Sequence, residues 1–79
     1  MLVYVLTYSD PSSRNEFLGA FGDLNEAKAS GTRHFRRYHP GDPRWENNGV
    51  GAKASHDKAE YNIQSIEITP SRHTSGASR

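Results

Sequence analysis

The first apolar segment of the chain, residues 2–8, carries apolar side chains at both odd and even positions. Its even positions hold leucine and tyrosine, and positions 3 and 5 hold valine. Such a two-sided pattern of β-branched and aromatic residues is typical of a central β-strand. A proline-containing stretch at 9–13 has turn chemistry, and residues 16–21 then alternate. We therefore predict a β-hairpin whose second strand places three residues on one face: Phe17, Gly19 and Phe21.

An amphipathic helix is predicted to begin directly after Asp23. Asp23 and Glu26 have the spacing of a capping box, in which the side chain of each residue accepts a hydrogen bond from the backbone N–H of the other. Apolar or small residues then recur at helical intervals and form one stripe that faces the core: Leu24, Ala27, Gly31, Phe35 and Tyr38. Pro40 and Gly41 are predicted to end the helix.

The segment 39–58 is rich in proline, glycine and asparagine, which predicts a long polar loop with room for a short strand at 50–54. The pattern of residues 59–69 then predicts the last strand. In this strand two apolar pairs fall on opposite faces: Tyr61 with Ile63, and Ile66 with Ile68. A β-bulge near Gln64 and Ser65 would bring both pairs onto the core side. Without a bulge, the strand would need cover on both faces.

The order of these elements, β-β-α-loop-β, predicts a small α+β fold. In it one helix packs on one face of an antiparallel sheet. We expect residues 1–69 to form a single domain, and the segment 70–79, which contains serine, arginine and glycine, to be a flexible tail.

Composition excludes several classes of protein. The 79 residues include no cysteine, so disulfides and thiolate metal sites are excluded. No apolar run approaches the roughly 20 residues that span a bilayer. The N-terminal segment also lacks the features of a signal peptide. We expect a cytoplasmic protein.

Charge is unevenly distributed although the net charge is only +1. Residues 1–27 are mainly acidic, whereas residues 28–44 hold five cations against Asp42 alone. The candidate partner-binding set consists of these five cations and one tryptophan: Lys28, Arg33, Arg36, Arg37, Arg44 and Trp45. Arginine suits this role because its guanidinium contacts carboxylates or phosphates with two hydrogen bonds.

Each of these features also has a purely structural interpretation. Cations near the end of a helix interact favourably with the helix dipole and commonly form a solvated face. Trp45 is either an exposed binding anchor or a plug over the edge of the core. The aromatic residues on the strands resemble base-stacking platforms, but a chain this short needs them for its core.

No catalytic motif is present, so we expect no enzymatic activity. The chain lacks a nucleophile elbow and a glycine-rich phosphate loop. His34 and His39 are five residues apart and do not share a helix face, and a metal site would need His56 or Asp42 from the loop. We expect no metal and no cofactor.

Two resemblances to known families accompany this pattern. Leu2-Val3-Tyr4 and Phe17-Leu18-Gly19 stand where the GIY-YIG nucleases have their two motif triplets, and Arg33 and Glu67 resemble the helix arginine and late glutamate of that family. The likeness is degenerate, because Leu2 replaces the first motif glycine and Phe17, which has no hydroxyl, replaces a motif tyrosine, so it implies a remnant of a nuclease rather than an active one. The order of strands and helix also resembles the small ββαβ proteins encoded by bacteriophages and mobile elements. That likeness implies an accessory factor or an inhibitor of a host system.

The leading hypothesis from the sequence is a small non-enzymatic binding protein that docks on a larger protein or nucleoprotein complex through its basic helix face. Direct nucleic-acid binding through the same residues is the alternative, and a remnant nuclease is a distant third. The acidic hairpin and the basic helix are also compatible with a homodimer.

Overall fold

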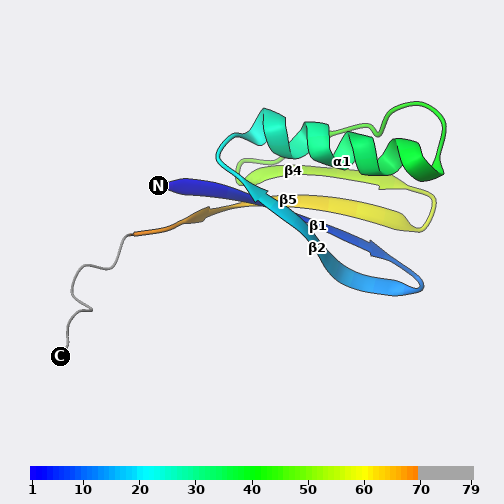
Figure 1. The fold of residues 1–79 in the computed structure, drawn as a ribbon, viewed down its shortest axis with the longest axis horizontal. Coiled ribbons are helices and arrows are strands. Elements are labelled where there is room, and N and C mark those ends of the chain that lie inside the picture. Colours follow the sequence, from blue (N-terminus) through cyan, green and yellow to red (C-terminus); the bar gives the residue numbers. More distant parts are fainter. Residues whose placement is uncertain (70–79) are drawn as a thin grey trace.

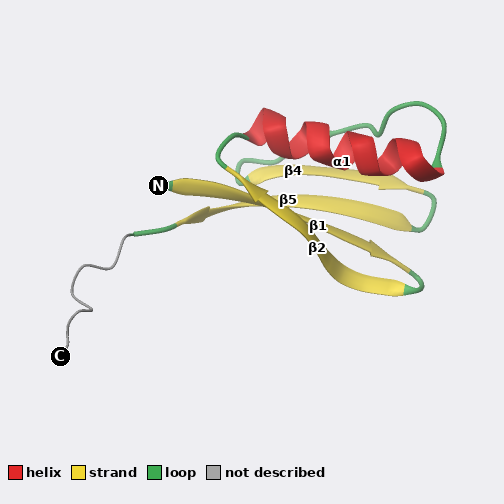
Figure 2. Cartoon of the chain, in the orientation of Figure 1, coloured by secondary structure: helices red, strands yellow, loops and turns green. Residues whose placement is uncertain are grey.

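The computed structural model describes residues 1–69; the predicted tail at 70–79 lies outside the described residues. It contains one helix and one five-stranded antiparallel sheet with the strand order β2-β1-β5-β4-β3. The helix lies along one face of the sheet (Figures 1 and 2). The predicted α+β fold is thus confirmed. The elements are β1 (Leu2–Asp10), β2 (Ser13–Phe21), α1 (Leu24–Tyr38), β3 (Glu46–Asn47), β4 (Gly51–His56) and β5 (Ala59–Glu67).

The hairpin of β1 and β2 forms as predicted, but its second strand is not regular. The pairing shifts between Leu6, which is opposite Gly19, and Thr7, which is opposite Phe17. Leu18 is the extra residue of this β-bulge. Because directly opposed residues share a face, Phe17 lies on the face away from the helix. The expectation that Phe17 shares a face with Phe21 is therefore wrong.

Strand β5, in contrast, is regular. It pairs with β1 over eight consecutive positions, from Leu2 opposite Glu67 to Ser9 opposite Glu60, with no shift in register. Of the two alternatives considered for this strand, the one without a bulge near Gln64 is therefore observed. Tyr61 and Ile63 consequently face the helix and are buried, whereas Ile66 projects from the other face and is 45% exposed.

Helix α1 begins and ends where the sequence signals predict. The Asp23 carboxylate accepts a hydrogen bond of 2.6 Å from the backbone N–H of Asn25, and the N–H of His39 closes the helix on the carbonyl of Phe35 at 2.9 Å. The face toward the sheet buries Ala27, Gly31 and Phe35. Tyr38, the last member of the predicted stripe, is instead 66% exposed.

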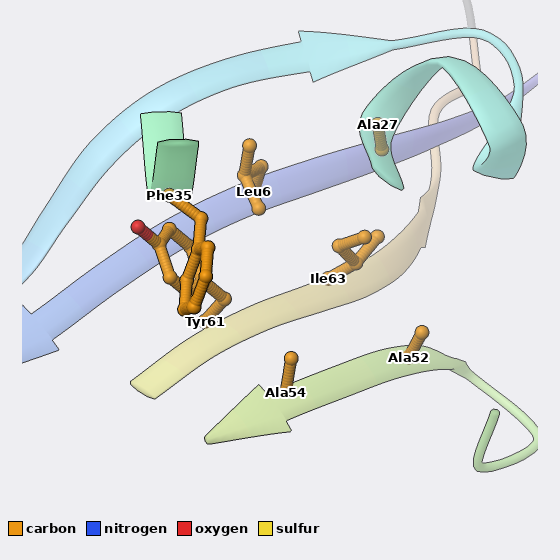
Figure 3. Packing of buried hydrophobic residues seen from close by; sticks show 7 residues of the cluster. All are labelled: Leu6, Ala27, Phe35, Ala52, Ala54, Tyr61 and Ile63. Carbon is orange, nitrogen blue, oxygen red and sulfur yellow. The ribbon is translucent and has the colours of Figure 1, made fainter. Parts of the chain in front are cut away.

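The core lies between this helix face and the centre of the sheet (Figure 3). Its buried side chains come from α1, β1, β4 and β5: Leu6, Ala27, Phe35, Ala52, Ala54, Tyr61 and Ile63. Three of the seven are alanines, one on the helix and two on β4. Leu18 and Trp45 pack against the edges of this cluster.

The predicted long loop at 39–58 is partly structured. Strand β4 confirms and extends the short strand expected there, and the two residues of β3 add an edge strand beside it. The connection that remains irregular runs from His39 to Trp45. Its path along α1 determines the neighbours of the helix cations.

The second face of the sheet has no helix over it among residues 1–69. On this face Val3 lies opposite Ile66, and Thr7 lies opposite Phe17, which is 65% exposed. Toward β4 the face becomes polar, with an ion pair of 3.4 Å between Lys53 and Glu60. None of the described residues belongs to a helix long and apolar enough to cross a bilayer.

Candidate functional site

The candidate cations do not form one surface, because α1 distributes them between two flanks. On the flank toward β3, Lys28 Nζ donates to Asn47 Oδ1 at 2.7 Å. About two turns further on, Arg36 Nε donates to Asp42 Oδ1 at 2.7 Å, and the two residues form an ion pair. Strand β3 and the loop after the helix therefore each provide a partner for one of these cations.

Trp45 lies on the same flank and is partly buried. Its indole Nε1 donates to the Thr32 hydroxyl at 3.1 Å, and its ring stands edge-on to Tyr61 with centroids 6.0 Å apart. Gly31 leaves room for the ring on the helix. Trp45 is thus a plug over the core edge rather than an exposed anchor. Arg44, its neighbour, is exposed.

Arg33 and Arg37 are the two arginines that point away from this loop. Both are exposed, and neither has a hydrogen bond or an ion pair within residues 1–69. Together with Leu18, Ser30 and His34 they line a cavity of about 330 Å³ between the helix and β2. We call Arg33 and Arg37 the basic ridge.

A second cavity, of about 390 Å³, adjoins the basic ridge at His34. It is lined by Tyr8, Asp10, Glu16, His34, Tyr38 and His39. Tyr8 on β1 lies directly between Glu16 on β2 and Tyr61 on β5, so the sheet supplies the floor. The helix supplies the opposite wall. We call this space the aromatic cavity.

Aromatic rings form a continuous cluster around the aromatic cavity. The ring centroids of Tyr8 and His34 are 4.9 Å apart, and those of His34 and Tyr38 are 5.2 Å apart. Tyr61 lies beneath them, 4.9 Å from Tyr8. Tilted contacts at these distances are favourable between aromatic rings.

Burial and hydrogen bonding together shift the pKa values of the titratable groups in this cluster. The hydroxyl of Tyr8 donates to Asp10 Oδ2 at 2.6 Å, and this bond to the carboxylate, with burial, raises the pKa of Tyr8 to about 12. Burial likewise raises the pKa of Tyr61 to about 12 and lowers the pKa of His34. The phenol therefore stays protonated and the imidazole neutral at pH 7. The Tyr61 hydroxyl and His34 Nδ1 share a hydrogen bond of 2.7 Å.

Sequence reasoning did not single out the aromatic cavity. It assigned Tyr8 to a central strand, considered His34 only as a metal ligand, and counted Glu16 only among the acidic residues of the hairpin. The alternation of β1 and β2 carries the relevant signal, but only once the bulge is known. With a regular register, Phe17 rather than Glu16 would lie beside Tyr8.

His39 and His56, the other two histidines within residues 1–69, meet at the end of the helix. The rings of His39 and His56 are 4.6 Å apart, and both line a third cavity of about 230 Å³. Within residues 1–69 no three side chains of histidine or acidic residues gather as metal ligands.

The residues that carry the resemblance to GIY-YIG nucleases are spread over the molecule. Tyr4 projects toward the helix side of β1, opposite Phe21, whereas Phe17 projects from the other face. Glu67 accepts a hydrogen bond of 2.6 Å from the N-terminal ammonium group of Met1. Arg33 lies on the helix, in the basic ridge.

The chain matches no protein family, no curated protein and no solved structure. Any statement on function therefore depends on the geometry of the chain itself.

Proposed function

We propose that this chain is a small non-enzymatic binding protein that docks on an acidic surface of a larger protein through the basic ridge. One observation carries the proposal: Arg33 and Arg37 have no anionic partner within the described chain, whereas Arg36 on the same helix is paired with Asp42. Two guanidinium groups one turn apart are therefore available to an external anion.

The chemistry of arginine supports a macromolecular anion as the partner. A guanidinium offers five N–H donors in a planar fork that fits a carboxylate with two parallel hydrogen bonds. Leu18 beside the basic ridge adds an apolar contact, which fits the mixed character of protein interfaces. The likeness to phage-encoded ββαβ proteins adds the proposal that such docking inhibits or assists a host complex.

The experiment compares two charge-reversed variants of equal net charge. Arg33→Glu with Arg37→Glu removes the basic ridge, whereas Arg14→Glu with Lys58→Glu makes the same change on exposed residues elsewhere. Each protein is titrated against immobilised polyglutamate, against a DNA duplex and against whichever protein it captures from lysate. We expect the first variant to bind the acidic protein at least about tenfold more weakly, and the second to match the wild type.

Salt dependence separates this proposal from direct nucleic-acid binding. Affinity for DNA falls on a double-logarithmic plot with a slope of about −0.9 per neutralised phosphate, so losing both arginines would flatten the slope by about 2. Tight DNA binding with that behaviour would replace the acidic protein by nucleic acid as the partner. Equal binding by both charge-reversed variants would show that the basic ridge is not the docking surface.

A further inference from the structure

The aromatic cavity lies beside the basic ridge but has the opposite chemistry. Its walls are rings and carboxylates: Tyr8, His34 and Tyr38 supply the rings, and Asp10 and Glu16 supply the acids. A cavity of about 390 Å³ is large enough for a group of several non-hydrogen atoms. The proposed docking function leaves this cavity unused.

The charge of the cavity is negative at neutral pH. Glu16 is exposed and has no hydrogen bond or ion pair within residues 1–69. Asp10 is held in place, with Oδ2 accepting from Tyr8 and Oδ1 accepting from the backbone N–H and hydroxyl of Ser12. Burial lowers the pKa of His34, so the imidazole, which shares a hydrogen bond with the Tyr61 hydroxyl, is neutral at pH 7 and brings no charge of its own. Arg37 on the adjacent basic ridge does not pair with Glu16.

Aromatic rings and carboxylates together favour one class of ligand. A delocalised or alkylated cation is weakly hydrated, so it gains from the electron-rich faces of rings as well as from the acids. Compact inorganic cations instead require a shell of oxygen ligands, which two carboxylates do not provide. Neutral ligands would leave the charge of Glu16 uncompensated.

We propose that the aromatic cavity binds an organic cation, either a guanidinium or an alkylammonium group, against the rings of Tyr8, His34 and Tyr38 that line it, with Glu16 as its counter-ion. The group arrives either on a small molecule or as the side chain of an arginine or modified lysine in a peptide. This site does not depend on the basic ridge, because its residues and its charge are different.

The test is an NMR titration of the full chain with two cations and their neutral counterparts at constant ionic strength. Tetramethylammonium is compared with tert-butanol, and Nα-acetyl-arginine amide is compared with Nα-acetyl-citrulline amide. We expect saturable shifts at Glu16, His34 and Tyr38 with the cations, at millimolar concentrations. The neutral counterparts should bind at least about tenfold more weakly.

Variants assign the effect to the cavity. Glu16→Gln and Tyr38→Leu should each weaken cation binding about five- to tenfold. The matched control, Glu26→Gln, removes one carboxylate from the first turn of the helix and should change nothing. Both cavity residues are exposed, so the variants should fold, and unchanged amide spectra away from the site confirm this.

The outcomes are distinct. Equal shifts with cations and neutral analogues, or full binding by Glu16→Gln, would overturn the proposal. If an arginine-containing peptide binds more tightly than Nα-acetyl-arginine amide, the cation belongs to a peptide. If both bind equally, the site takes a small molecule. Failure of the basic ridge experiment would leave this result unaffected.

Discussion

At the scale of single residues, Gly31 allows the ring of Trp45 to lie close against the helix. A Cβ atom built on Gly31 would lie 2.7 Å from Cζ2 and 2.8 Å from Cη2 of Trp45. The glycine therefore serves close approach rather than an unusual backbone conformation. In the sequence Gly31 is one member of the core stripe, and its neighbour in the structure is a ring from the loop.

We expect Gly31→Ala to destabilise the protein by about 1–2 kcal/mol. Its gain in helix propensity, up to about 1 kcal/mol, is outweighed by the displacement of a wedged ring. Urea unfolding should show the loss, and tryptophan fluorescence should shift to the red as the indole leaves Thr32. Gly22→Ala is the control, since a Cβ there meets nothing within 4 Å. Equal stability of both variants would contradict this account.

His34 should make stability depend on pH. Burial lowers the pKa of His34 from its ordinary value of 6.5, so the unfolded chain takes up this proton more readily than the folded one. Stability from this group is complete above about pH 6.5 and is lost as pH falls through the folded pKa. The groups that face His34 are Tyr8, Glu16, Arg37, Tyr38 and Tyr61.

The measurement is urea unfolding of the wild type and of His34→Gln between about pH 7 and pH 5. Glutamine can still accept a hydrogen bond from Tyr61 but cannot become charged. We expect the variant to lose less stability than the wild type over this interval. The other three histidines are common to both proteins, so their contributions cancel in the difference.

At the scale of elements, the ends of the helix are fixed by local chemistry. Asp23 has an extended backbone conformation and caps the N–H of Asn25. We expect Asp23→Ala to lower the free energy of unfolding by about 1 kcal/mol, whereas Asp23→Asn should retain most of the stability because asparagine is an equally good cap. Chemical denaturation of the three proteins tests this. An asparagine variant as unstable as the alanine variant would contradict it.

Local signals were sufficient to predict the elements but not the faces of the strands. The helix, the hairpin and the last strand follow from caps, turns and periodicity near each segment. The sequence pattern allowed a bulge in β5, near Gln64, but β5 is regular and a bulge occurs in β2, at Leu18. A bulge is defined by how a strand pairs with its neighbour. The periodicity within a single strand therefore does not show which strand contains the extra residue.

For the same reason, only part of the candidate site could be predicted from the sequence. The cations of α1 are evident in the sequence, and helical spacing separated Arg33 and Arg37 from the core stripe. Whether Arg36 and Lys28 are free depends on Asp42 and Asn47, which the loop and β3 bring to the helix. The aromatic cavity draws on three elements at once, so no single segment carries its signature.

At the scale of the whole molecule, the sheet has a strong centre and weaker edges. β1 and β5 pair with each other over eight positions, and each has a second neighbour. β3 has two residues and lies at one edge, and β2 lies at the other with its bulge. The helix stabilises one face of this arrangement.

We expect native-state hydrogen exchange to follow this order. Amides of β1 and β5 that pair with each other should exchange most slowly, near the rate set by global unfolding, since opening them breaks the central ladder. Amides of β3 and of the outer side of β2 should exchange fastest among the strands. NMR in deuterated buffer measures this directly. Slow exchange along the free edge of β2 would indicate instead that another chain pairs there.

Leu18, the extra residue of β2, has a consequence for how this chain tolerates indels. Because the bulge holds one residue outside the ladder, deleting Leu18 would let Gly19 and Phe17 become direct neighbours opposite Leu6 and Thr7 with no change of pairing. Phe17 would stay on the outer face and Glu16 beside Tyr8. The hairpin could therefore lose one codon at this position without inverting a strand, whereas a deletion at a regularly paired position of β1 or β5 would turn the following side chains over.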